Sequence, residues 1–77
     1  MFEKVRTIIA DVCQMPEEEI TEQTNLTADL GLNSFDIMNI VCAFEERYDI
    51  TVPTRDVWQL RQVSDVVKYL AEKGITE

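Results

Sequence analysis

Histidine is absent from this chain of 77 residues, and cysteine, glycine and proline occur only twice each. Without histidine, the chain lacks the usual general base at neutral pH and the commonest zinc ligand. Two glycines and two prolines are too few for the many tight turns of an all-β domain. The two cysteines, Cys13 and Cys42, lie far apart with no CxxC spacing. One such pair is not a disulfide framework, so we expect a reducing compartment.

Other signals of location and chemistry are missing as well. No apolar stretch reaches the length that spans a membrane, and no charged start followed by an apolar run marks a signal peptide. The chain also lacks a GxSxG elbow, metal-ligand spacing and a calcium-binding DxDxDG loop. We therefore expect a cytoplasmic protein with no membrane partner, no metal and no catalytic residues.

Basic residues are scarce, at 7 against 15 acidic ones, which gives a net charge of -8. This charge argues against nucleic acid and anionic membranes as partners and suits a protein with a basic surface. Residues 1–50 hold 11 acids and 3 bases, whereas residues 51–77 hold 4 of each. We expect an acidic partner surface in the first two thirds of the chain, with simple solubility as the alternative.

The length predicts a single domain, residues 1–77, with one modest core. Apolar residues at helical spacing predict a first helix from Phe2 to Val12, which Met15-Pro16 ends. Residues 16–33 show no sustained period, apart from a possible short turn at residues 17–19. We expect this long loop to be functional, because three leucines can anchor it to the core. They are Leu26, Leu30 and Leu32.

A second helix is predicted to start at Ser34 and to stop near Asp49. Its core side is expected to hold Ile37, Ile40, Val41, Phe44 and Tyr48. Its opposite face carries Phe35, Asn39, Cys42, Ala43 and Glu46. Residues 50–53 are expected to be loop.

Two further helices complete the predicted fold. Thr54 is expected to cap a short helix running through Val57 and Leu60. A last helix starts near Val63, without a clear capping residue before it, and stops at Gly74. The fold class is all-α: a small four-helix bundle of three main helices and one short helix, with a long loop between the first two main helices.

Ser34 is the most informative residue. On physical grounds alone, the simplest interpretation is a helix N-cap, since serine is favoured there and Asp36 in the first turn suits the helix dipole. The alternative is attachment of a phosphate group, because a serine at a helix start is exposed beside free N–H groups. Ser34 is not expected to be a hydrolase nucleophile, since no histidine is available as its base.

The sequence around Ser34 resembles a known family. Residues 30–36, Leu-Gly-Leu-Asn-Ser-Phe-Asp, look like the acyl carrier protein signature, which usually runs Leu-Gly-x-Asp-Ser-Leu followed by Asp or Glu. Residues 43–50 and the Val52-Pro53 pair resemble the family's next segment, and residues 63–70 resemble the start of its final helix. The resemblance covers nearly the whole chain in the right order.

The resemblance implies a carrier that is not an enzyme. A phosphopantetheinyl transferase would move 4'-phosphopantetheine from coenzyme A to Ser34, and the terminal thiol would carry acyl groups as thioesters. The implied partners are acyl-transferring and acyl-activating enzymes of fatty-acid, polyketide or related biosynthesis, with basic docking patches that meet a monomeric carrier. The acids that match the family's recognition surface are Asp36, Glu45 and Glu46.

Three residues depart from the family's usual pattern. Asn33 stands where Asp is common, Phe35 where Leu is usual, and Asn39 where many fatty-acid carriers have Glu. Together with Cys42, Phe35 and Asn39 predict a partner surface that relies more on hydrophobic contact. We therefore expect a specialised carrier.

Other roles stay open at this stage. Trp58 is either a core side chain or a partly exposed residue that flanks the prosthetic arm or a partner. An acyl chain held between the helices, as in the family, would contact Ile8, Ile37, Ile40, Val41, Phe44 and Leu70. Cys42 is expected to be a contact residue and Cys13 a buried or boundary residue. The alternative function is an unmodified acidic adaptor that binds a basic protein.

Overall fold

The computed structural model describes residues 1–75, and residues 76 and 77 of the predicted domain lie outside the described residues. The described chain is helical, and its β-structure is limited to one isolated bridge between Asn25 and Gln62. The predicted all-α bundle with one short helix is confirmed. Its elements are α1 (Phe2–Cys13), the 3-10 turn η1 (Glu17–Glu19), α2 (Ser34–Tyr48), α3 (Thr54–Val57) and α4 (Val63–Glu72).

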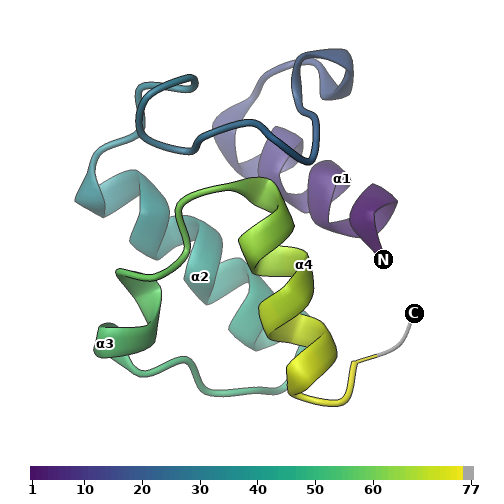
Figure 1. Ribbon diagram of the computed structural model, residues 1–77, viewed down its shortest axis with the longest axis vertical. Coiled ribbons are helices and arrows are strands. Elements are labelled where there is room, and N and C mark those ends of the chain that lie inside the picture. The colour runs from purple at the N-terminus through teal and green to yellow at the C-terminus, as the bar shows by residue number, and fades with distance from the viewer. Residues whose placement is uncertain (76–77) are drawn as a thin grey trace.

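The helices pack around one apolar core. Helix α1 contacts both α2 and α4, and the short α3 packs on α2, while the long loop crosses above them (Figure 1). The predicted core side of α2 is right, because Ile40, Val41 and Phe44 are buried. The core cluster is made of Val5, Ile9, Ala10, Ile20, Leu26, Ile40, Phe44, Val63, Val66 and Leu70.

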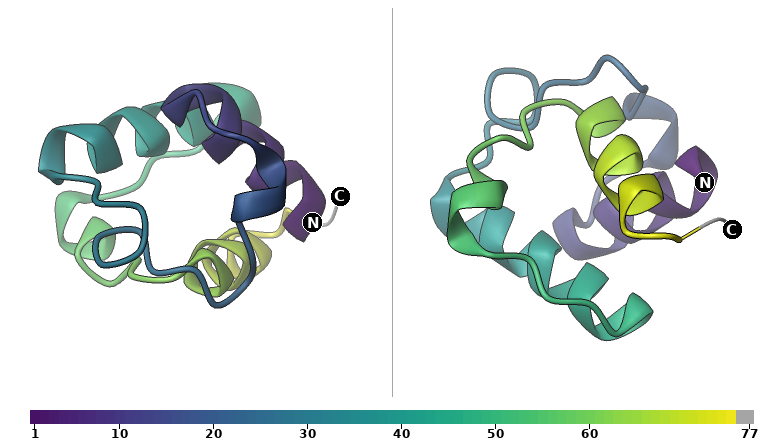
Figure 2. Two further views of the ribbon diagram at one scale, coloured as in Figure 1. Left: turned by 90° about the horizontal axis from the view of Figure 1, so that it is seen from above. Right: turned by 60° about the horizontal axis from the view of Figure 1, so that its bottom comes forward.

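Residues 20–33 are joined to the start of α4 by backbone hydrogen bonds. The N–H of Leu26 donates to the carbonyl of Arg61 at 2.8 Å, and the N–H of Val63 donates to the carbonyl of Thr24 at 3.0 Å. Leu26 is buried, and Leu30 and Leu32 pack partly against the core. These contacts hold the loop against the start of α4 (Figure 2).

Helix α3 differs from its prediction at both ends. Thr54 is its first helical residue and makes no cap, because Pro53 occupies the N-cap position. The helix ends at Val57, and Leu60 lies in the following turn. The hydroxyl of Tyr69 in α4 donates to Asp56 Oδ2 at 2.7 Å, which ties α3 to α4. Burial and this hydrogen bond raise the pKa of Tyr69 to about 12.

Helix α4 has a start signal that its sequence prediction lacked. The Asp65 carboxylate in its first turn accepts hydrogen bonds from the N–H groups of Gln62 at 3.0 Å and Arg61 at 3.2 Å. These hydrogen bonds from the residues before the helix to Asp65 cap the start of α4. At the other end Gly74 has a φ of 90°, a conformation that favours glycine, so the predicted stop is right.

Candidate functional site

The start of α2 is capped by Asn33 and not by Ser34. Asn33 Oδ1 accepts from the N–H of Asp36 at 2.9 Å, and Asp36 Oδ2 accepts from the N–H of Asn33 at 3.3 Å. This reciprocal pair is a capping box. The capping interpretation of Ser34 is therefore wrong by one position. The capping box also explains why asparagine can stand at position 33, since asparagine caps a helix as well as the aspartate that is usual in the family.

Ser34 is left with an exposed side chain at the first position of α2. Within the described residues, its hydroxyl makes no hydrogen bond. The N–H groups of the first turn of a helix have no intrahelical acceptor, and they carry the positive end of the helix dipole. A nucleophilic oxygen and a partial positive charge therefore lie together at this point.

A groove of about 530 Å³ opens beside Ser34. The loop forms one side of it and the turn between α3 and α4 forms the other. Its lining residues are Asn25, Thr27, Leu32, Asn33, Ser34, Ile37, Val57, Trp58, Leu60 and Arg61. Trp58 is 58% exposed, so the interpretation of this residue as part of the core is wrong and the exposed alternative is right. The reason is that Val57, at 2% exposed, takes the inward position of α3.

The outer face of α2 is apolar at its start. Phe35 is 73% exposed and Met38 is 38% exposed, and Asn39 and Cys42 are exposed on the same helix. Met38 was missed by the sequence analysis, although its spacing of three from Phe35 places it on the neighbouring part of the helix surface. The described structure thus leaves Phe35, Asn39 and Cys42 exposed on α2, as predicted from their spacing.

The three predicted recognition acids have different surroundings. Asp36 is engaged in the capping box, and Glu45 Oε2 accepts from the N–H of Val52 at 2.9 Å. Both side chains are partly buried, whereas Glu46 is exposed. Of the three carboxylates, only that of Glu46 accepts no hydrogen bond from a backbone N–H group in the described residues.

The two cysteines differ in their exposure. Cys13 is half-buried at the end of α1, and its thiol has a raised pKa because of burial and the nearby Asp36 carboxylate. A raised pKa keeps the thiol protonated and poorly reactive. Cys42 is exposed, which fits the predicted contact role.

A void between the helices of residues 1–75 is too small for an acyl chain in this conformation. A void of only about 10 Å³ lies between α2 and α4, and its lining is entirely apolar. That space is about one water molecule in size. Of the six predicted chain-contacting residues, it is lined by Val41, Phe44 and Leu70. Ile37 lines the groove beside Ser34, Ile40 is a core residue, and Ile8 faces a different groove.

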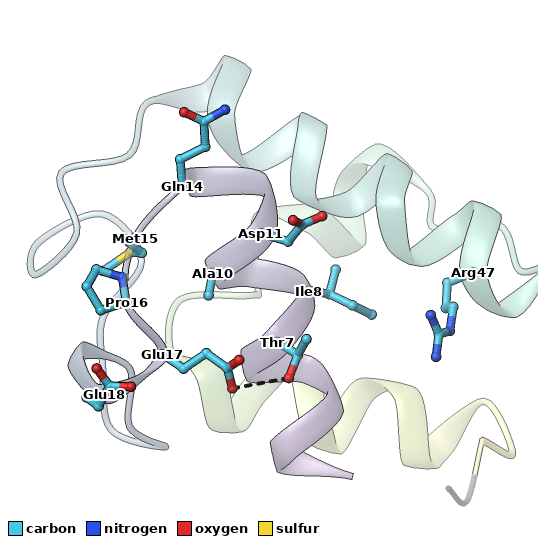
Figure 3. Close-up of a pocket in the computed structure, with 10 residues that line it drawn as sticks. All are labelled: Thr7, Ile8, Ala10, Asp11, Gln14, Met15, Pro16, Glu17, Glu18 and Arg47. Atoms are coloured by element: carbon cyan, nitrogen blue, oxygen red, sulfur yellow. Dashed lines mark hydrogen bonds between the residues drawn. The ribbon is translucent and has the colours of Figure 1, made fainter.

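That different groove has a volume of about 740 Å³ and does not include Ser34 among its lining residues. It runs along α1 and η1, and Arg47 of α2 also lines it (Figure 3). Its rim is fixed by the Thr7 hydroxyl, which donates to Glu17 Oε1 at 3.2 Å. It contains none of the predicted site residues, and its charged lining residues are Asp11, Glu17, Glu18 and Arg47.

Residues 1–75 contain neither a candidate metal cluster nor a helix that could span a membrane. No cluster of three or more cysteine, aspartate or glutamate side chains is placed to hold a metal ion. In the same part of the chain, every helix is too short or too polar to cross a bilayer.

The chain is similar to known proteins along most of its length. Residues 3–70 match the family model described as a phosphopantetheine attachment site. The chain is 39% identical over 72 residues to the acyl carrier protein of Clostridium perfringens, covering 94% of this chain and 95% of that protein. It is 41% identical over 68 residues to the acyl carrier protein of Akkermansia muciniphila, covering 88% and 85%.

A solved structure of a candidate acyl carrier protein from Mycobacterium tuberculosis has the same fold. It superposes with a TM-score of 0.85 at 25% sequence identity, over 94% of this chain and 96% of that one. The family match covers residues 3–70, and the two relatives are 39% and 41% identical to this chain over most of their length. The chain therefore belongs to the acyl carrier protein family, whose members carry a covalently attached 4'-phosphopantetheine group.

Proposed function

We propose that Ser34 is the residue that carries 4'-phosphopantetheine, and that the protein is a carrier of acyl thioesters and not a catalyst. One observation carries this proposal: Ser34 is exposed at the start of α2, and the capping box of Asn33 and Asp36 leaves its hydroxyl without a structural task. The hydroxyl oxygen would form the new phosphodiester bond as the pyrophosphate bond of coenzyme A breaks and 3',5'-ADP leaves. Because the chain has no histidine, the transferase must supply the base that takes the hydroxyl proton.

The residues around Ser34 fit a phosphodiester. The first-turn N–H groups of α2 and the helix dipole favour a negative charge at this point. The prosthetic group supplies the terminal thiol that binds acyl groups, while the protein supplies the position and the surroundings of the arm. The proposed partners are a phosphopantetheinyl transferase and the acyl-activating and acyl-transferring enzymes of fatty-acid, polyketide or related biosynthesis.

The attachment is tested by intact mass after incubation with coenzyme A and a broad-specificity transferase. We expect the wild-type chain to gain one phosphopantetheinyl group and Ser34→Ala to gain none. The chain offers a matched control, because Ser64 is its only other serine and also lies in the first turn of a helix. Ser64→Ala should be modified like the wild type. A wild-type chain that stays unmodified beside a modified control carrier would favour the adaptor alternative.

We further propose that the outer face of α2 is the docking surface for partner enzymes. Its centre is apolar, and it carries less negative charge than in carriers that have Glu at the position of Asn39. Phe35, Asn39 and Cys42 would supply the contact area, and Glu46 would steer a basic partner. Asp36 and Glu45 are included in this surface, but their bonds to the backbone of residues 33 and 52 restrict their carboxylates. A neutral residue at 39 and an exposed Phe35 favour a specialised carrier.

Association and dissociation rates with the transferase separate these contributions. Truncating a central apolar contact mainly speeds dissociation, so Phe35→Ala should weaken binding by about 1–3 kcal/mol. Rim charges mainly affect association, so Glu46→Lys should slow association most at low salt. Glu18→Lys on η1 is the matched charge control and should have a smaller effect. If Phe35→Ala changes neither rate, the apolar centre is wrong.

A further inference from the structure

We propose that the groove beside Ser34 is the resting site of the prosthetic arm, with Trp58 packed against the pantetheine chain and Arg61 paired with the phosphodiester. This inference rests on the proposed attachment to Ser34. The groove begins at the attachment residue and has a volume of about 530 Å³. Small-molecule sites typically measure about 300–1,000 Å³, so an arm of this kind fits.

Trp58 contributes a large apolar surface to this groove. Its side chain is 58% exposed although it is the largest apolar group in the chain. Its backbone is helical, with φ -68° and ψ -11°, and its neighbour Val57 is buried, so the outward direction of the indole is set by α3. An exposed indole at a groove provides a flat apolar surface together with one N–H donor. A pantetheine chain offers both counterparts, in its methyl groups and its amide carbonyls.

Arg61 supplies the positive charge in a strongly acidic protein. Its backbone is held at two points, because its carbonyl accepts from Leu26 and its N–H donates to Asp65. Arg61 is an exposed residue that lines the groove, and its side chain forms no ion pair within residues 1–75. Arginine side chains bind phosphate oxygens through charge-assisted hydrogen bonds. A phosphodiester on Ser34 would enter the same groove, so the two charges can meet there.

The other hollows near α2 are less suitable because of their charge. The groove of about 300 Å³ between α1 and α2 is lined by Cys13, Asp36 and Asn39, and its carboxylate would repel a phosphodiester. The larger groove along α1 is lined by three acids against one base, Arg47, and does not include Ser34. Both the tether and the electrostatics therefore select the groove that contains Trp58 and Arg61.

The resting site can be tested directly because Trp58 is the only tryptophan. Intact mass first establishes that the sample carries the arm. We then expect the indole of the modified protein to show nuclear Overhauser contacts to the pantetheine methyl groups. Quenching of its fluorescence by acrylamide, a neutral quencher, should fall by about half on modification. Ser34→Ala mixed with free coenzyme A is the control for contact without a tether, and its quenching should be unchanged.

The role of Arg61 is tested with a second arginine as control. Arg61→Gln should restore most of the acrylamide quenching in the modified protein, whereas Arg55→Gln on α3, which does not line the groove, should not. A modified wild-type protein with unchanged quenching and no Overhauser contacts overturns the resting site and leaves the attachment intact. Equal effects of the two arginine variants overturn the pairing with the phosphodiester. A chain without a mass gain overturns both proposals.

Discussion

Replacing Asn33 with alanine should destabilise the protein, and replacing Ser34 with alanine should not. Asn33→Ala removes the oxygen that accepts from the Asp36 N–H at 2.9 Å. Loss of an asparagine N-cap typically costs about 1 kcal/mol, within a range of roughly 0.5–2 kcal/mol. Ser34→Ala removes a hydroxyl that makes no hydrogen bond in the described structure and introduces a better helix former. Its free energy of unfolding should therefore stay within about 0.5 kcal/mol of the wild type.

The change should be easy to measure in a domain of this size. A destabilisation of about 1 kcal/mol lowers the midpoint of thermal unfolding by roughly 4–8 °C for a domain of 60–100 residues. Asn33→Asp is the matched control, because aspartate caps as well as asparagine, and its midpoint should change little. The double variant Asn33→Ala with Asp36→Ala should lose less than the sum of the single variants, since the two side chains form one reciprocal box.

The assay is thermal and urea unfolding of the unmodified protein, followed by far-ultraviolet circular dichroism. Both methods should give the same order of stability, with Ser34→Ala close to the wild type and Asn33→Ala below both. If Ser34→Ala instead loses as much stability as Asn33→Ala, then the serine hydroxyl caps α2 in solution. In that case the assignment of its side chain as free for modification is wrong.

Three other properties can be checked on the same samples. Glu45→Ala removes the acceptor of the Val52 N–H and should cost about 1 kcal/mol in urea unfolding, while Glu46→Ala should be neutral within error. The folded-state pKa of Tyr69 is raised from 10.0 to about 12, so its hydrogen bond to Asp56 stabilises the fold below pH 10 and is lost towards pH 12. The stability of the wild type relative to Tyr69→Phe should therefore shrink across this pH range, and a constant difference would contradict the bond. The net charge of -8 predicts that the unfolding midpoint rises with sodium chloride, because salt screens the repulsion among exposed acids, and a flat or falling midpoint would count against this.

The parts of the fold that follow from apolar spacing were predictable from the sequence. The spacing of the apolar residues in α2 places Ile40, Val41 and Phe44 on the side of the helix that faces the core. The same holds in α4 for Val63, Val66 and Leu70. The exposed face of α2 followed from the same geometry. Such predictions depend only on the period of a helix, which the sequence displays directly.

The parts that depend on one backbone angle were not predictable. The N-cap of α2 falls on Asn33 because this residue is extended, with φ -94° and ψ -178°, and Ser34 is already helical. Both residue types are good caps, so the sequence alone cannot choose between adjacent positions. Trp58 is similar, since one turn of helix is too short to define an inward face until Val57 is seen in the core.

The hydrogen bonds between the loop and the start of α4 also determine the order in which the chain can fold. The carbonyl of Arg61 and the N–H of Val63 are the partners of Leu26 and Thr24, which lie far earlier in the sequence. During synthesis, the loop that leads to Ser34 lacks these two partners until residues 61–63 have left the ribosome. Contacts of such long range form late, because the intervening chain must first be closed into a ring. A transferase that requires the ordered loop would then act only on chains whose final helix is in place, so that modification reports complete folding.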